Sequence, residues 1–354
     1  MGERDKEGKA VPKVSVIVPM YDCGPYIEEC LESLKAQSLG DFEAICVDDA
    51  SSDDTVGRAK ACIDGDPRFS VLTLTENRGQ GAARNVALDR AQGEYIVLLD
   101  ADDYLVPDAL EKLWRRAVAQ DLDDLYFAGR SFYDSQDTKG LIWEGLDERT
   151  PFEEVADGRT LFTLLKSRGE FFPHAALRMV KRSLIEGHGI RFYEGIIHED
   201  ALFTFQTLVV SERSSFLSDA VYMRRIRPGS TMTARTQGIA TVVGHFVCVR
   251  EMKRWMKAHA QELDSAFIEA MMGQIDAFAH WAGYDWCRNE DSQAKAAYLA
   301  SLTNEEKVDF YADVVYRGES EKRTEDGILQ SRPYRVGDAL LKGPRLIKHK
   351  IQGR

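Results

Sequence analysis

The stretch Tyr95-Ile-Val-Leu-Leu-Asp-Ala-Asp-Asp103 is a short apolar run that ends in three carboxylates. Because polar residues do not alternate within the run, it predicts a strand that is covered on both faces of its sheet. Three similar runs precede it, and the segments between them have helical spacing. The expected strands are Val14–Pro19, Phe42–Val47, Phe69–Leu74 and Tyr95–Leu99, and the expected helices are Pro25–Gln37, Ser52–Ile63, Gly79–Ala91 and Pro107–Ala119. This β-α-β-α order predicts an α/β fold, in which helices flank a mostly parallel sheet and crossovers are right-handed. Pro25 and Pro107 suit the first turn of a helix, and Ser51 or Ser52 suits an N-cap.

The rest of the chain has a different pattern. Residues 135–235 are mixed, and from about Ile239 apolar side chains recur every three or four residues, which predicts two amphipathic helices. These side chains are Val242, Phe246, Val249 and Met256, followed by Phe267, Met271, Ile275 and Phe278. Such a stripe is more often core than a cofactor site. We therefore expect a disordered N-terminus at 1–12, a main domain at 13–235, a helical extension at 236–330 and a basic amphipathic tail at 331–354.

Composition excludes several classes of protein. The 354 residues have a net charge of −12, which argues against a protein that binds nucleic acid through overall charge. The tail differs, because Arg332 to Arg354 contains seven Lys or Arg and one Asp, a net charge of +6.

The six cysteines lack C-x-x-C spacing, which argues against a zinc site and a disulfide framework and favours a reducing compartment. The polar N-terminus and the lack of an apolar run of about 18 residues predict a soluble, cytoplasmic protein.

Carboxylates follow two of the predicted strands. Ligands of parallel sheets bind beyond the carboxyl ends of the strands, which directs attention to Pro19–Asp22, Asp48–Asp54 and Asp100–Asp103. Carboxylates that are close together repel one another, and a cation such as Mg²⁺ or Mn²⁺ compensates. The alternative for Asp100–Asp103 is a solvated turn that caps the next helix.

Two further segments have the chemistry of nucleotide binding. An Asp after the second strand can accept a hydrogen bond from uracil N3–H. Ordinary turn and N-cap chemistry explains Ser51–Asp54 equally well, although it explains Asp48 and Asp49 less readily. In Asn77–Asn85, small residues open a helix and leave backbone N–H groups for an anion, but the spacing is neither G-x-G-x-x-G nor a P-loop.

Taken together, these segments resemble family 2 of the inverting glycosyltransferases, which have the GT-A fold. The resemblance rests on Val14–Tyr21, Val47–Thr55, Arg78–Asn85, Gly93–Ile96 and Leu99–Asp103, which follow the family's order. It implies that residues 13–134 are a nucleotide-sugar half and residues 135–235 an acceptor half. It also implies that Pro19, Tyr21 and Asp49 hold the uracil of a UDP-sugar, with Arg78 or Arg84 facing the nucleotide. In the implied DXD motif, Asp102 is the direct metal ligand and Asp100 supports the ribose or the metal.

Two segments of the second half also resemble the family. Ile197–Phe203 is similar to its "ED" segment, which implies that Asp200 is the general base and that His198 and Glu199 lie beside the acceptor. The alternative is an ordinary first helical turn, where acidic residues are common. Tyr222–Ser230 is similar to a loop that closes on the diphosphate. Some relatives have a metal-binding His there, whereas this chain has Arg225 and Arg227, which we expect to contact phosphate.

The resemblance implies a metal-dependent inverting glycosyltransferase that uses Mg²⁺ or Mn²⁺. Its expected donor is a UDP-hexose or UDP-N-acetylhexosamine, and its expected acceptor is a glycan or lipid-linked saccharide in bacterial surface polysaccharide synthesis. A phosphatase with a DxD nucleophile is one alternative, but it would have that motif near the first strand. A non-catalytic nucleotide-sugar or membrane-binding scaffold is another, and intact Asp102 and Asp200 argue against it. We expect the tail to bind the anionic inner face of the cell membrane, the alternative being a frayed, solvated terminus.

Overall fold

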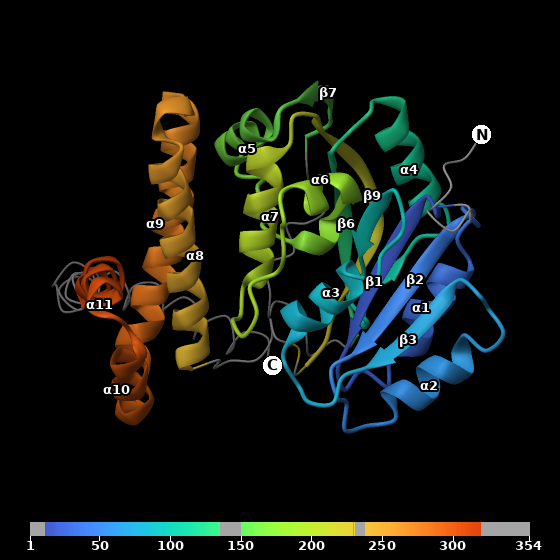
Figure 1. Ribbon diagram of the computed structural model, residues 1–354, viewed down its shortest axis with the longest axis horizontal. Helices are drawn as coiled ribbons and strands as arrows, with labels where there is room; N and C mark the ends of the chain where they lie inside the picture. Colours follow the sequence, from blue (N-terminus) through green and yellow to red (C-terminus); the bar gives the residue numbers. More distant parts are fainter. Residues whose placement is uncertain (1–10, 135–149, 229, 231–237, 320–354) are drawn as a thin grey trace, which may run out of the picture. The chain divides into compact units, whose positions relative to one another are not determined.

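The computed structural model describes residues 11–134, 150–228, 230 and 238–319 (Figure 1). Residues 1–10 of the expected N-terminal segment 1–12, and the whole basic tail at 331–354, lie outside the described residues. The chain divides into two compact units, one of residues 1–237 with 251–273 and the other of residues 238–250 with 274–354. The division therefore cuts through the two long helices that follow residue 238.

The first unit is built on a sheet of nine strands among the described residues. The first four are β1 (Val14–Met20), β2 (Phe42–Asp48), β3 (Phe69–Thr73) and β4 (Tyr95–Leu98), in the order β3-β2-β1-β4, and all their pairings are parallel. The others are β5 (Tyr104–Leu105), β6 (Asp124–Tyr133), β7 (Phe152–Ala156), β8 (Arg178–Lys181) and β9 (Ser214–Ile226). Beyond β4 the sheet is mixed, since β8 is antiparallel to both β4 and β6, whereas β6 and β9 are parallel. The parallel arrangement thus holds where strand and helix alternate along the chain.

Each expected helix of the first half is present and slightly shorter than predicted. They are α1 (Ile27–Lys35), α2 (Thr55–Cys62), α3 (Gln80–Leu88) and α4 (Ala109–Ala119). The expected N-cap of α2 was wrong, because Asp54 rather than Ser51 or Ser52 precedes the helix. The two serines bind other groups instead: the Ser51 hydroxyl donates to Asp48, and the Ser52 backbone N–H donates to Asp22 at 2.7 Å. Pro25 and Pro107 lie in the turns before α1 and α4, not in the first helical turn.

The strand order creates a switch point beside β1. The connections from β1 to β3 move in one direction across the sheet, and the connection from β3 to β4 returns past β1. Right-handed crossovers then place α3 on the face opposite α1 and α2 (Figure 1). Ile17 pairs with Leu98, so the chain leaves β1 and β4 at neighbouring points, which is where ligands of such sheets bind.

Close packing of the chain before β4 requires a glycine. A Cβ atom at Gly93 would lie 2.4 Å from the backbone nitrogen of Ser15, which is far inside van der Waals contact. With glycine there, its N–H donates to the Ser15 hydroxyl at 2.8 Å. The contact fixes the register in which β4 enters the sheet beside β1.

The remaining helices follow the second half of the sheet and then the extension. They are α5 (Gly158–Ser167), α6 (Arg182–Gly187), α7 (Glu199–Val210), α8 (Ile239–Ala258), α9 (Ser265–Arg288), α10 (Ser292–Ser301) and α11 (Asn304–Phe310), with 3₁₀ turns at Ala175–Leu177 and Ala260–Glu262 and a π-helical turn at Tyr311–Val315. The two helices expected after Ile239 are confirmed as α8 and α9. In the second unit the ring of Phe310 packs edge-on against Phe246 at 5.0 Å and Trp286 at 4.9 Å, so these side chains form a core. Within the described part of the chain, none of the helices is both long and apolar enough to cross a membrane.

Candidate active site

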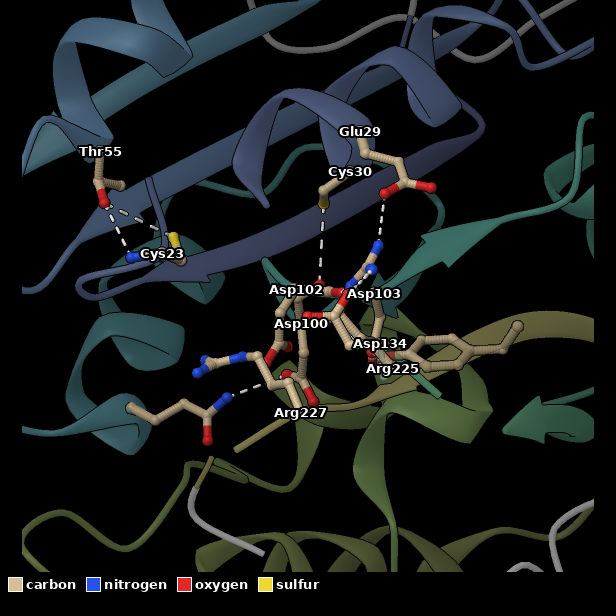
Figure 2. Close-up of polar contacts among 12 residues, drawn as sticks. Cys23, Glu29, Cys30, Thr55, Asp100, Asp102, Asp103, Asp134, Arg225 and Arg227 are labelled. Carbon is tan, nitrogen blue, oxygen red and sulfur yellow. Dashed lines mark hydrogen bonds and ion pairs between the residues drawn. The ribbon is translucent and has the colours of Figure 1, made fainter. Parts of the chain in front are cut away.

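The turn after β4 presents three carboxylates in two different environments (Figure 2). Asp100 Oδ1 accepts hydrogen bonds from Arg84 Nη2 at 2.8 Å and Gln80 Nε2 at 2.9 Å. Asp102 Oδ2 accepts from Arg227 Nε at 2.7 Å. Asp103 is buried instead, and accepts from the Tyr222 hydroxyl at 2.6 Å and the backbone N–H of Arg225 at 2.7 Å. Asp103 therefore ties β9 to the turn, which leaves Asp100 and Asp102 as the partly exposed pair.

Burial and mutual repulsion make this turn unfavourable for negative charge. Burial raises the pKa of Asp102, and it raises the pKa of Asp103 well above its usual range, with the charge of Asp102 adding to the effect. A cation would relieve this. In the described ranges there is no group of three or more His, Cys, Asp or Glu side chains arranged to hold a metal ion. Asp102 and Asp100 nevertheless fit Mg²⁺ or Mn²⁺, because such ions are usually held by one or two carboxylates plus substrate phosphates.

A buried arginine joins this turn to the start of α7. The side chain of Arg84 in α3 is 0% exposed, and it pairs with Asp100 at 2.8 Å, with Glu199 at 3.1 Å and with Asp200. Burial disfavours the charge on Arg84, but the three carboxylates outweigh burial and raise its pKa. Burial and the neighbouring Asp200 raise the pKa of Glu199 to about 7, although Arg84 opposes them. Carboxylates from both halves of the first unit thus meet at one guanidinium.

Local backbone geometry explains why α7 delivers its carboxylates here. His198 precedes the helix in the left-handed conformation, with φ of 72°, and Glu199 and Asp200 form the first turn, where the helix dipole favours negative charge. Burial lowers the pKa of His198, although the charge of Asp200 opposes this. Gly81 allows α3 to approach closely, because a Cβ there would lie 3.1 Å from the carbonyl oxygen of Tyr193 and 3.3 Å from Glu199 Cγ.

The residues expected to hold uracil lie on adjacent loops of the first half. Pro19 is in β1, and Tyr21, just past its end, is 51% exposed. Asp49 is buried, and its two carboxylate oxygens accept the backbone N–H groups of Arg78 at 2.8 Å and Gly79 at 2.7 Å. Asp49 therefore fixes the loop that leads into α3. The exposed Arg78 side chain pairs with Glu194 at 2.7 Å.

Arg225 lies near the end of β9 and Arg227 just past it, and both reach the carboxylate turn (Figure 2). Arg225 Nε donates to the carbonyl oxygen of Asp102 at 2.9 Å, and its other nitrogens pair with Asp134 at 2.8 Å and with Glu29. The Arg227 side chain binds the Asp102 carboxylate. The structure therefore brings Asp100, Asp102 and these two arginines together, although the sequence analysis related the arginines only to phosphate.

Three residues that make contacts in the site were missed by the sequence analysis. Gln80 binds Asp100, Tyr222 binds Asp103, and Glu194 accepts from Asn85 Nδ2 at 3.1 Å as well as from Arg78. Gln80 and Asn85 lie within the Arg78–Asn85 segment, and Tyr222 opens the Tyr222–Ser230 segment, so motif membership was the available signal. Glu194 has no such signal.

Comparison with known proteins identifies the domain. Residues 15–189 match the family model "Glycosyl transferase family 2". This domain belongs to glycosyl transferase family 2. The match covers the carboxylate turn and α3, and similar solved structures confirm the GT-A-like fold expected from the sequence.

The chain is also similar in sequence to curated relatives and in fold to solved structures. Over 229 residues, the chain is 28% identical to the glycosyltransferase GlyA of Streptococcus pneumoniae, which corresponds to 64% of this chain and 32% of GlyA. The chain is 31% identical to each of two further curated relatives, and these matches span 63% and 62% of the relatives' own lengths. The structure of S. aureus TarS 1-349 in complex with UDP-GlcNAc matches 85% of this chain and 79% of that chain, with a TM-score of 0.60 and 24% identity. The mannosyltransferase PcManGT of Pyrobaculum calidifontis, in complex with GDP-Man and Mn²⁺, matches 92% of this chain and 82% of that chain, with a TM-score of 0.55 and 20% identity.

Proposed function

We propose that this family 2 protein is a metal-dependent inverting glycosyltransferase that uses a UDP-sugar. The observation behind the proposal is that Asp100, Glu199 and Asp200 meet at the buried Arg84, beside Asp102. The TarS complex with UDP-GlcNAc supports a UDP-linked hexose or N-acetylhexosamine as donor, and the PcManGT complex supports a divalent cation. A glycan or lipid-linked saccharide in bacterial surface polysaccharide synthesis is the proposed acceptor.

Asp200 is the proposed general base. An inverting transfer needs a base within hydrogen-bonding reach of the acceptor hydroxyl, on the face opposite the leaving diphosphate. The Asp200 side chain is 22% exposed, whereas that of Glu199 is 9% exposed, so Asp200 is the carboxylate that an acceptor reaches more easily. Arg84 holds Asp200 in place, and Glu199 and His198 are assigned to the acceptor side.

The donor is assigned to the first half of the domain. Pro19, Tyr21 and Asp49 are proposed to hold the uracil, and Arg78 to face the nucleotide. Asp102 would hold Mg²⁺ or Mn²⁺, with Asp100 in support; a bound cation supplies charge neutralisation for the leaving diphosphate. Arg225 and Arg227 add positive charge on the same side, which suits contact with phosphate.

Release of UDP from individual UDP-sugars, with and without Mn²⁺, tests the proposal directly. Asp102→Asn should lower the rate about a hundredfold or more, because the diphosphate charge is then poorly neutralised. Asp121→Asn is a matched control, since that exposed carboxylate pairs with Lys181 at 2.9 Å outside the site. Full activity in excess EDTA would contradict the metal requirement.

Replacement of the proposed base separates chemistry from donor binding. Asp200→Asn should lower the transfer rate roughly 10²–10⁴-fold, while calorimetry shows UDP affinity close to that of the wild type. If UDP affinity fell together with the rate, Asp200 would be a structural residue and the assignment of the base would be wrong.

We also infer a peripheral location on the inner face of the cell membrane, where a lipid-linked acceptor would be present. The support is the sequence of the tail, with its net charge of +6 interleaved with apolar residues.

A further inference from the structure

The carboxylate proposed to hold the metal is already occupied by an arginine of the same chain. Arg227 Nε donates to Asp102 Oδ2 at 2.7 Å, and the two side chains are 18% and 20% exposed (Figure 2). The pair is therefore largely shielded from water, which makes it stronger than a typical surface ion pair. A divalent cation on this oxygen would have to displace the guanidinium.

Arg227 is held in this position from a second side. Its guanidinium lies over the ring of Tyr26 at 4.8 Å, and that of Arg225 lies over the same ring at 5.1 Å. Arg225 pairs with Asp134 and Glu29, and its Nε donates to the carbonyl oxygen of Asp102. Arg227 differs from Arg225 in binding the carboxylate that the proposed metal needs.

Displacement of Arg227 from Asp102 by a cation is costly unless an anion takes the place of the carboxylate beside the guanidinium. Asp102 is paired with Arg227, whereas Arg84 is shared by Asp100, Glu199 and Asp200. A cation at Asp102 would leave the Arg227 charge without this partner, in a region that also contains Arg225. The diphosphate of the donor is an anion that can accept a guanidinium through two parallel hydrogen bonds.

We propose that Arg227 is an exchangeable counter-ion that competes with the divalent cation for Asp102. It makes tight cation binding depend on the donor diphosphate, which accepts Arg227 when the cation displaces it. This inference rests on the proposed function, because it assumes that Asp102 is the metal ligand. Since coupling between two ligands is reciprocal, the cation must raise donor affinity by the same factor.

Mn²⁺ binding measured by electron paramagnetic resonance, with and without saturating UDP, tests the inference without any turnover. In the absence of UDP, Arg227→Met should bind Mn²⁺ about tenfold more tightly than the wild type, a difference of about 1.4 kcal/mol. With UDP present, Arg227→Met should bind Mn²⁺ no more tightly than the wild type, so the ratio of the two affinities should fall at least about tenfold. Arg227→Lys keeps the charge but loses the planar guanidinium group, so its Mn²⁺ affinity should lie between those of the wild type and Arg227→Met.

Arg224→Met is the matched control for long-range charge. Arg224 lies on β9, three residues before Arg227, and its Nε donates to the Ser131 hydroxyl at 3.2 Å. The inference is overturned if Arg227→Met binds Mn²⁺ alone like the wild type, or if Arg224→Met tightens binding equally. If wild type and Arg227→Met both fail to bind Mn²⁺ even with UDP, the metal assignment to Asp102 fails, and this inference with it.

Discussion

Replacement of Arg84 by methionine should destabilise the protein in a way that grows with pH. Methionine keeps much of the side-chain length but removes the positive charge that Asp100, Glu199 and Asp200 share. Removing one partner of a buried ion pair typically costs about 3–5 kcal/mol, because the remaining charge is left without compensation. We expect a loss in the free energy of unfolding of that size at pH 9.

The pH dependence follows from Glu199. Its pKa is raised from 4.5 to about 7 in the folded protein, so the contribution of Glu199 to wild-type stability falls as pH rises from 4.5 to 7 and then levels off. Without Arg84, which opposes this rise, the pKa should be higher still, and the loss should continue above pH 7. The gap between variant and wild type should therefore widen by about 1.4 kcal/mol per pH unit from pH 7 until the new pKa is reached.

Urea unfolding followed by tryptophan fluorescence at pH 6, 7.5 and 9 measures this gap. Arg78→Met is the control, because Arg78 pairs with Glu194 where both side chains are more than 40% exposed, and such pairs contribute about 0–1 kcal/mol. A gap for Arg84→Met that stays below about 1 kcal/mol, or that does not change with pH, would refute the reasoning.

Two further predictions concern other parts of the chain. Asp124→Asn should destabilise the protein by about 3–5 kcal/mol in urea unfolding, because it leaves the fully buried Arg178 without its counter-charge. As the control, Asp121→Asn at the exposed pair with Lys181 should cost about 1 kcal/mol or less. Equal effects of the two substitutions would contradict the prediction. Vesicle sedimentation with anionic lipids should pellet the full chain at low salt but not a chain that ends at Gln330, since each cation near such a surface contributes about 1 kcal/mol. If the two chains behaved alike, the tail would have no part in membrane binding.

The sequence by itself determined the first half of the fold. Continuous apolar runs and helical spacing are local properties, and they placed β1–β4 and α1–α4 to within a few residues. The same local reasoning located the carboxylates, because a strand's end can be recognised without knowing its neighbours. The resemblance of five ordered segments then supplied the family, which the match over residues 15–189 supports.

Only the tertiary structure decided how those residues are connected. Arg84 is separated from Glu199 by 115 residues, and Arg227 from Asp102 by 125, so no local pattern relates them. Asp102 and Asp103 are adjacent in the sequence, yet one is partly exposed and the other is buried against Tyr222. These outcomes depend on which strands pair and in what register. Strand pairing is set by packing of the whole core, because a contact between distant segments becomes favourable only when the rest of the sheet has brought them together.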